Sequence, residues 1–192
     1  LSSEGEIMKL TYYGHSCFAV EIGSTTLLFD PFITPNDLAR AVDVNAVKAD
    51  FILVSHGHAD HLADGVNIAK RTGATVVANF EVANWFNRQG VAKTHPMNHG
   101  GTARFDFGRV KYVNAIHSSS LPDGSYGGNP GGFVIESSAG NFYYSGDTAL
   151  TMDMKLIGEL FRLKFAVLCV GDTFTMGVED AIRAADMVGC SE

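Results

Sequence analysis

The chain has 192 residues, of which 46% are hydrophobic and 18% are charged, and its formal net charge is −7. This composition is that of a folded globular chain and excludes a disordered polymer. The acidic balance, without any basic run, disfavours binding along nucleic-acid phosphates, whereas a small anionic substrate held by metals or a few cationic groups stays compatible with it.

No apolar stretch approaches the roughly 20 residues that a membrane-spanning helix needs, and the polar start "LSSEGEI" is unlike a signal peptide. The three cysteines are widely spaced and include no CxxC pair, which favours a reducing, cytoplasmic setting. Met8 looks like the natural start, so residues 1–7 are expected to be an upstream or vector-derived extension. A single domain is expected over 8–192.

The predicted elements begin with segment 8–30, which is rich in β-branched and aromatic residues and is expected to form two or three antiparallel strands. Residues 31–50 contain two prolines and are expected to be mostly loop with a short helix. The apolar run "FILVS" at 51–55 is typical of a strand buried on both faces. A helix is expected over 62–73, with Gly73 as its C-terminal cap.

The rest of the chain alternates strands, hairpins and helices. The expected elements, in chain order, are a strand at 75–79, a helix at 81–90, hairpins at 101–117 and 131–147, an amphipathic helix at 150–163, a buried strand at 165–171 and a helix at 177–189. Antiparallel hairpins mixed with strand–helix units, without repeats or linkers, predict one α/β domain in which two packed sheets carry helices outside.

The segment "SHGHADHLAD", residues 55–64, contains three of the seven histidines and follows the apolar run directly. Residues i and i+2 of an extended segment point to the same side, so His56 and His58 can face one metal ion. Asp60 and His61 lie at the expected start of a helix, where a bend would turn them toward a second ion. Imidazole and carboxylate are the usual ligands of Zn²⁺, Fe or Mn. The alternative interpretation is that these histidines and aspartates are solvated loop residues, but a loop does not require them at this spacing.

Two further strand ends carry candidate ligands. His117 follows the apolar strand in "YVNAIHSS", and Asp147 follows another in "FYYSGDT". Either residue alone would be interpreted as a turn or cap residue. Together with the histidine-rich segment they predict a common site, because the strand ends of one sheet can converge.

Through "SHGHADH", "AIHSS" and "YYSGDT" the chain resembles the metallo-β-lactamase fold hydrolases. The opening "LTYYGHSCFAVEIGSTTLLFDPF" and the segment "FTMGVEDA" are similar to the small metal-dependent hydrolase branch that includes ascorbate-phosphate lactonase-like proteins. The resemblance implies an α/β fold of the αββα four-layer sandwich type with a dinuclear site. That family usually supplies one more histidine from a late strand, and no histidine follows His117. The expectations are a truncated chain without its C-terminal strand, an incomplete second site, or a site completed by a partner chain.

The resemblance also implies which residues bind metal and what they do. The implied ligands are His56, His58 and His117 for the first ion, Asp60 and His61 for the second, and Asp147 bridging both. Zn²⁺ is expected first, as one or two ions per chain, with Mn²⁺ or Fe²⁺ as alternatives. A hydroxide between the ions would be the nucleophile, and Asp60 would orient it or relay a proton.

Three more residues are candidates for substrate contacts or for supporting the ligands. His15 in "YYGHSC" is expected to be a core or supporting histidine, with a substrate contact as the alternative and a direct metal bond disfavoured. Asp30 either hydrogen-bonds a metal-binding histidine or caps a turn. Asp172 is expected to face the pocket without a direct metal bond.

The predicted function is hydrolysis of a small, anionic ester, lactone or phosphoester in the cytoplasm, with no nucleic-acid or membrane partner. A homo-oligomer formed through an unpaired sheet edge is left open. The alternative is a catalytically silent metal-binding or scaffold protein, because a fold does not establish activity. A nuclease is disfavoured by the acidic charge.

Overall fold

The computed structural model describes residues 7–190, and the chain forms two compact units. The first unit runs up to Met97 and includes Ser119–Gly128, and the second comprises Asn98–Ser118 and the chain from Asn129 onward. The extension expected over residues 1–7 lies, apart from Ile7, outside the described residues. The expectation of a single domain over 8–192 stays a prediction.

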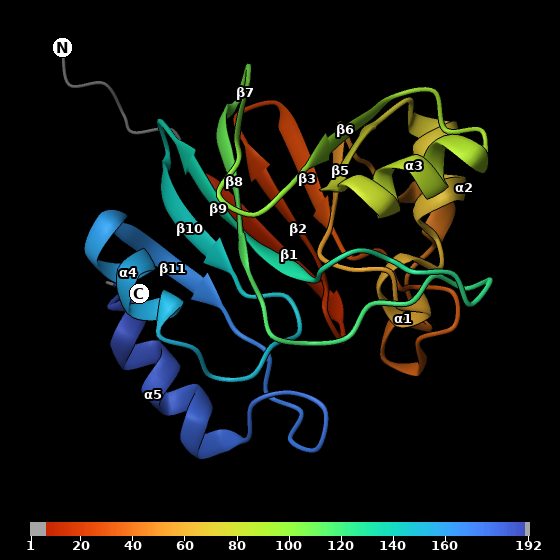
Figure 1. The fold of residues 1–192 in the computed structure, drawn as a ribbon. Helices are drawn as coiled ribbons and strands as arrows, with labels where there is room; N and C mark the ends of the chain where they lie inside the picture. Colours follow the sequence, from red (N-terminus) through yellow and green to blue (C-terminus); the bar gives the residue numbers. More distant parts are fainter. Residues whose placement is uncertain (1–6, 191–192) are drawn as a thin grey trace, which may run out of the picture. The chain divides into compact units, whose positions relative to one another are not determined.

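The first unit is built on a six-stranded sheet, which Figure 1 shows in red to green. Its strands, in sheet order, are β1 (Met8–Gly14), β2 (Cys17–Ile22), β3 (Thr25–Phe29), β4 (Phe51–Val54), β5 (Thr75–Asn79) and β6 (Thr94–Met97). The first three strands form an antiparallel meander, and β3 to β6 run parallel to one another. Strand β6 is missing from the prediction because it contains Pro96, which an edge strand tolerates.

Helices cover one face of this first sheet. They are α1 (Ala59–Leu62), α2 (Gly65–Thr72) and α3 (Phe80–Arg88), with short 3-10 helices at Asp37–Ala39 and Val44–Ala46. Ile68 and Phe86 from the helices pack with Leu28, Ile52 and Val76 from the strands in one buried cluster. The helix expected over 62–73 is therefore confirmed in its second part, whereas its first residues belong to the separate helix α1.

The second unit contains a five-stranded sheet with the order β11-β10-β9-β8-β7. Its strands are β7 (Thr102–Phe105), β8 (Gly108–Asn114), β9 (Gly131–Ser137), β10 (Gly140–Tyr144) and β11 (Leu163–Val167). Neighbouring strands are antiparallel except β10 and β11, which are parallel. Both predicted hairpins are confirmed. The buried strand expected over 165–171 is wrong in extent and burial, because β11 is a half-buried edge strand.

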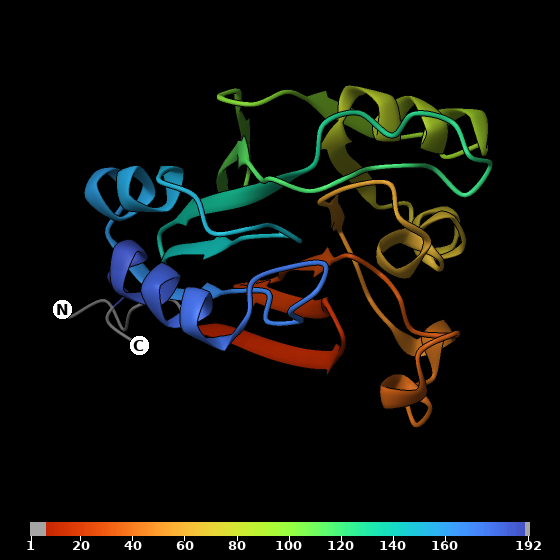
Figure 2. The same ribbon diagram turned by 60° about the horizontal axis from the view of Figure 1, so that its bottom comes forward.

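Two helices, α4 (Asp153–Leu160) and α5 (Val178–Val188), lie side by side against this second sheet (Figures 1 and 2). Met154, Ile157 and Ala184 from the helices share a buried cluster with Val134 and Tyr143 from the sheet. The predicted α/β class with two sheets is thus confirmed. No helix among residues 7–190 is both long and apolar enough to cross a membrane.

Candidate metal centre

The candidate centre of the first unit lies where two parallel strands end. Strands β3 and β4 are parallel neighbours, so their carboxyl ends meet at one edge of the sheet. Asp30 follows β3 and Ser55 follows β4. The amide of Asp30 donates to the Leu53 carbonyl at 3.0 Å, and its backbone has the unusual φ of 39°. This geometry turns the Asp30 side chain toward the end of β4, where it is fully buried.

The Asp30 carboxylate orients the chain after β4 through three hydrogen bonds. Its Oδ1 accepts from the Ser55 amide at 2.7 Å, and its Oδ2 accepts from the Ser55 hydroxyl at 2.5 Å. The same Oδ2 lies 2.7 Å from Nδ1 of the buried His61. Since an ionised carboxylate only accepts, Nδ1 of His61 carries the proton. The metal-binding nitrogen of His61 is then Nε2, an arrangement typical of metal-bound histidines.

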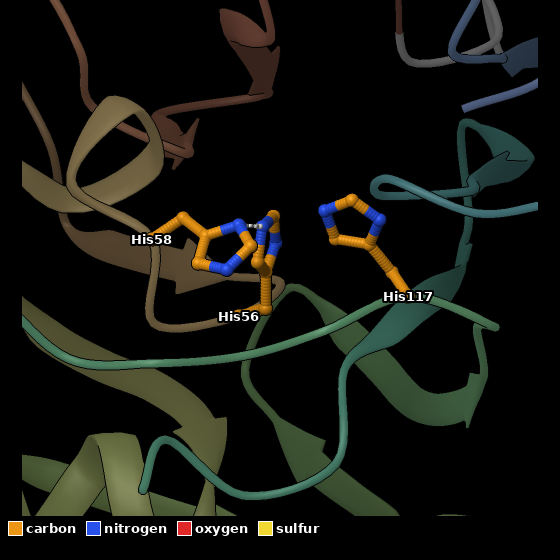
Figure 3. A group of neighbouring side chains, drawn as sticks. All are labelled: His56, His58 and His117. Atoms are coloured by element: carbon orange, nitrogen blue, oxygen red, sulfur yellow. Dashed lines mark hydrogen bonds between the residues drawn. The ribbon is translucent and has the colours of Figure 1, made fainter. Parts of the chain in front are cut away.

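The Ser55 hydroxyl connects Asp30 to His56 and orients the His56 ring. Its Oγ lies 2.9 Å from His56 Nδ1, and because it donates to Asp30 it accepts from His56. The lone pair of His56 is therefore on Nε2, which lies 3.0 Å from His58 Nδ1 (Figure 3). Two nitrogens on one tetrahedral zinc ion, with bonds of roughly 2.0–2.1 Å, would be about 3.3 Å apart. The two rings thus fit a shared ion.

Gly57 allows the two histidines to be this close in sequence and in space. Its amide donates to Ser119 Oγ at 3.0 Å, and a Cβ there would lie 3.2 Å from the Ser120 carbonyl oxygen and from the Leu121 side chain. His58 then begins α1 as its N-cap, in an extended conformation. The glycine between the histidines thus lets the loop pack closely before the helix starts.

A second donor group in the same unit combines Asp60 and His61 with His15. Their candidate ligand atoms all lie within 4.8 Å of one another. Asp60 Oδ2 is 3.4 Å from His15 Nε2 and 4.0 Å from His61 Nε2. The hydrogen bond from His15, helped by the charge of His61 against the opposing effect of burial, lowers the pKa of Asp60 to about 2. Asp60 is therefore ionised at neutral pH, as a metal ligand must be.

Asp30, His56 and His61 also lie close enough to hold an ion. Three hydrogen bonds already occupy the Asp30 oxygens. We therefore assign Asp30 to orienting His56, through Ser55, and His61.

The second unit brings His117 and Asp147 together by the same strand-end logic. Strands β8 and β10 both pair antiparallel with β9, so they run in the same direction and end at the same edge. Each residue comes three positions after its strand. His117 Nε2 lies 3.8 Å from Asp147 Oδ2, and the two side chains are 10% and 14% exposed. His117 is drawn with the two histidines of the first unit in Figure 3.

Asp172 lies in an exposed turn of the second unit. Its backbone has φ 54°, its Oδ1 accepts from the Thr173 amide at 2.9 Å, and its carbonyl accepts from the Thr175 amide at 2.9 Å. These contacts are those of a turn residue, and among residues 7–190 Asp172 belongs to none of the groups that could hold a metal ion.

Two supporting residues are missing from the sequence analysis. Ser55 connects Asp30 to His56 by hydrogen bonds. The sequence feature that could have identified it is a hydroxyl residue between a buried strand and a histidine motif. Buried Asp64 accepts from the amides of Ile33 and Thr34 at 2.7 and 2.8 Å and from the Thr34 hydroxyl at 2.6 Å. It ties the loop after Asp30 to the junction of α1 and α2, where the predicted single helix is interrupted.

Comparison with known sequences places the chain in a family. Residues 25–192 match the family described as "Beta-lactamase superfamily domain". The chain is 58% identical over 186 residues to a UPF0173 metal-dependent hydrolase of Christiangramia forsetii. It is 55% identical over 185 residues to one of Methylacidiphilum infernorum. Each match covers 96% of this chain and 82% of the relative.

The fold agrees with a solved relative. The structure of a metallo hydrolase from the archaeon Ignicoccus hospitalis superposes with a TM-score of 0.84 at 32% identity, covering 94% of this chain and 78% of that one. The metallo-β-lactamase fold predicted from the sequence motifs is thereby confirmed. With a family match over most of its length and relatives named for the same activity, the chain belongs to the β-lactamase superfamily domain family and is a metal-dependent hydrolase of the metallo-β-lactamase superfamily.

Proposed function

We propose that this protein hydrolyses a small anionic ester, lactone or phosphoester in the cytoplasm, using Zn²⁺ ahead of Mn²⁺ or Fe²⁺. The observation that carries the proposal is the His56–His58 pair, whose ring nitrogens are 3.0 Å apart. The buried Asp30–Ser55 connection holds His56 in the tautomer that a metal ligand needs. Such orientation of an imidazole by a buried carboxylate is typical of metal sites and is not needed by a surface loop.

The proposed ligands follow the family pattern carried onto this sequence. They are His56, His58 and His117 for one ion, Asp60 and His61 for another, and Asp147 shared by both. Support within the first unit comes from the Asp30 contacts and from the low pKa of Asp60. Support within the second unit is the approach of His117 to Asp147.

The chain's own groups suit hydrolysis at such a centre. Bound transition-metal ions supply an acidified water and polarise the group that is attacked. Asp60, half exposed and ionised, can accept a hydrogen bond from the attacking water and orient it. Its low pKa favours this orienting role over storage of a proton.

The charge balance of the proposed site favours an anionic substrate. Two divalent ions would bring four positive charges, whereas Asp30, Asp60 and Asp147 bring three negative ones. The histidine ligands are neutral, so the loaded site would carry one net positive charge with water bound and none once that water is a hydroxide, whereas the whole chain carries −7. A substrate with a carboxylate or phosphate close to its scissile bond would therefore be drawn to the centre, while a long polyanion would be repelled by the rest of the surface.

The test combines metal analysis with a substrate panel. Protein purified without chelator is analysed for Zn, Mn and Fe and assayed on p-nitrophenyl acetate, a γ-lactone, p-nitrophenyl phosphate and bis-p-nitrophenyl phosphate. We expect turnover that a chelator abolishes, that metal restores, and that His58→Ala and Asp147→Ala remove. His95→Ala, in β6, is the matched control and should stay active. A metal-free protein, or turnover unaffected by either variant, would overturn the proposal.

A further inference from the structure

His15 lies on a turn whose backbone is held in an uncommon conformation. The register between β1 and β2 shifts between Tyr12 and Gly14, and both Gly14 and His15 have positive φ, at 105° and 54°. Positive φ is unfavourable for a residue with a Cβ and is found where surrounding contacts enforce it. Here the Tyr12 hydroxyl donates to the His15 carbonyl at 2.9 Å. The turn thus directs His15 at some energetic expense.

The His15 ring points at the donor group at the start of α1. Its Nε2 is 3.4 Å from Asp60 Oδ2, and its ring centre is 5.3 Å from that of His61. The Phe32 ring packs against the same ring in a T-shaped arrangement, with 5.4 Å between ring centres. An aromatic side chain therefore limits the ring's rotation, while the His15 and Asp60 side chains remain 36% and 48% exposed.

We propose that His15 is a further protein ligand of the ion held by Asp60 and His61, so that the first unit supplies three ligands to it. Two imidazoles and one carboxylate whose candidate atoms lie within 4.8 Å of one another form a ligand set that transition metals accept with open coordination positions. The exposed side of this group leaves room for water and substrate at those positions. The inference rests on the proposed function, because it names a ligand of the same centre. The competing explanation is that His15 only donates a hydrogen bond to Asp60.

The experiment separates a ligand from a hydrogen-bond donor by metal titration, without using turnover. Chelator-treated wild-type protein, His15→Asn, His15→Gln and the control His95→Asn are titrated with Co²⁺ and followed by visible absorption against a competing chelator. Asparagine tolerates positive φ, so His15→Asn preserves the turn. Glutamine keeps a side-chain N–H for Asp60 but offers no imidazole nitrogen. Thermal melts of the metal-free proteins verify that each variant folds.

We expect wild type and His95→Asn to bind two Co²⁺ ions, and both His15 variants to bind one of them more than about 100-fold more weakly, since losing even an outer partner of a ligand costs 10–100-fold. In a His58→Ala background, His15→Asn should remove the remaining Co²⁺ absorption. Unchanged binding in both His15 variants, or full retention in His15→Gln alone, would overturn the ligand assignment and leave the hydrolase proposal standing. A wild type that binds one ion would do the same, whereas a wild type that binds none would overturn both.

Discussion

Replacing Asp30 by asparagine should uncouple the metal centre from the sheet that orients it. The substitution keeps the size of the side chain but turns one acceptor into a donor. Asp30 Oδ2 receives the Ser55 hydroxyl at 2.5 Å and His61 Nδ1 at 2.7 Å, while Oδ1 receives the Ser55 amide at 2.7 Å. An amide nitrogen at either position faces at least one donor. At the Oδ2 position it forces His61 to accept at Nδ1 and to carry its proton on Nε2, where a metal should bind.

The magnitude follows from these contacts. A buried donor left without its acceptor costs about 1–3 kcal/mol, so the free energy of unfolding of the metal-free protein should fall by about 2 kcal/mol. Loss of a group that orients a metal ligand typically weakens metal affinity by roughly 10–100-fold. Because the Ser55 hydroxyl would reorient too, His56 is also driven toward the wrong tautomer.

Two measurements check this prediction. Urea denaturation of the metal-free protein reports the free energy of unfolding, and Zn²⁺ titration against a fluorescent chelator reports affinity. Asp50→Asn is the matched control, since the exposed Asp50 side chain accepts a hydrogen bond from the Thr26 backbone amide at 2.8 Å and belongs to none of the candidate metal groups of the described residues. It should change stability by less than about 0.5 kcal/mol and leave affinity unaltered. Wild-type Zn²⁺ affinity in a folded Asp30→Asn protein would refute the role given to Asp30.

Three further predictions concern the same unit. Ser55→Ala removes the connection between Asp30 and His56, and Zn²⁺ titration should show affinity falling by roughly 10-fold, at the low end of the range for an orienting group; unchanged affinity would contradict it. Gly57→Ala forces a Cβ to 3.2 Å from the Ser120 carbonyl oxygen, so denaturation should show a loss of about 1–3 kcal/mol, and an unaltered midpoint would argue against the tight loop. Folding lowers the pKa of Asp60 to about 2, so its ionised form stabilises the metal-free protein above about pH 4, and this contribution disappears as the pH falls toward 2. Because Asp60 is 48% exposed, Asp60→Asn should lower the free energy of unfolding by less than about 1 kcal/mol at pH 7 and should not change it at pH 2. Urea denaturation that shows the same loss at both pH values would contradict this pH dependence.

The sequence predicted the elements that positioned the histidine motif because their signals are local. The short apolar run before the motif became β4, and the expected helix start at Asp60 became α1. Strand β6 was missed because its proline argues against a strand unless the strand lies at a sheet edge, and edge position is a property of the whole sheet. The break between α1 and α2 was missed because Asp64 bonds to a loop about 30 residues earlier in the chain.

The difference between local signals and contacts made by residues distant in the chain also explains what could be predicted of the candidate site. The spacing of His56 and His58 follows from the geometry of an extended chain, so their shared direction was readable from the sequence. The roles of Asp30 and His15 were left open because each depends on a nonlocal or strained feature. Asp30 reaches His61 only through the parallel pairing of β3 with β4, and His15 reaches Asp60 only through a turn with positive φ.

The Asp30 network also links the two halves of the histidine motif. One buried carboxylate orients His61 directly and His56 through Ser55, and these histidines are proposed to bind different ions. An ion bound at Nε2 of either histidine would withdraw electron density from that ring. The Nδ1–H of the same ring would then be a stronger hydrogen-bond donor, to Ser55 in the case of His56 and to Asp30 in the case of His61. The His61 N–H and the Ser55 hydroxyl, which itself accepts from His56, share the acceptor Oδ2 of Asp30, so strengthening one bond changes the other. Occupancy of the two sites should therefore be coupled, and the coupling should be weaker when Ser55 is replaced by alanine, because that substitution leaves the His61 bond intact and removes the path to His56.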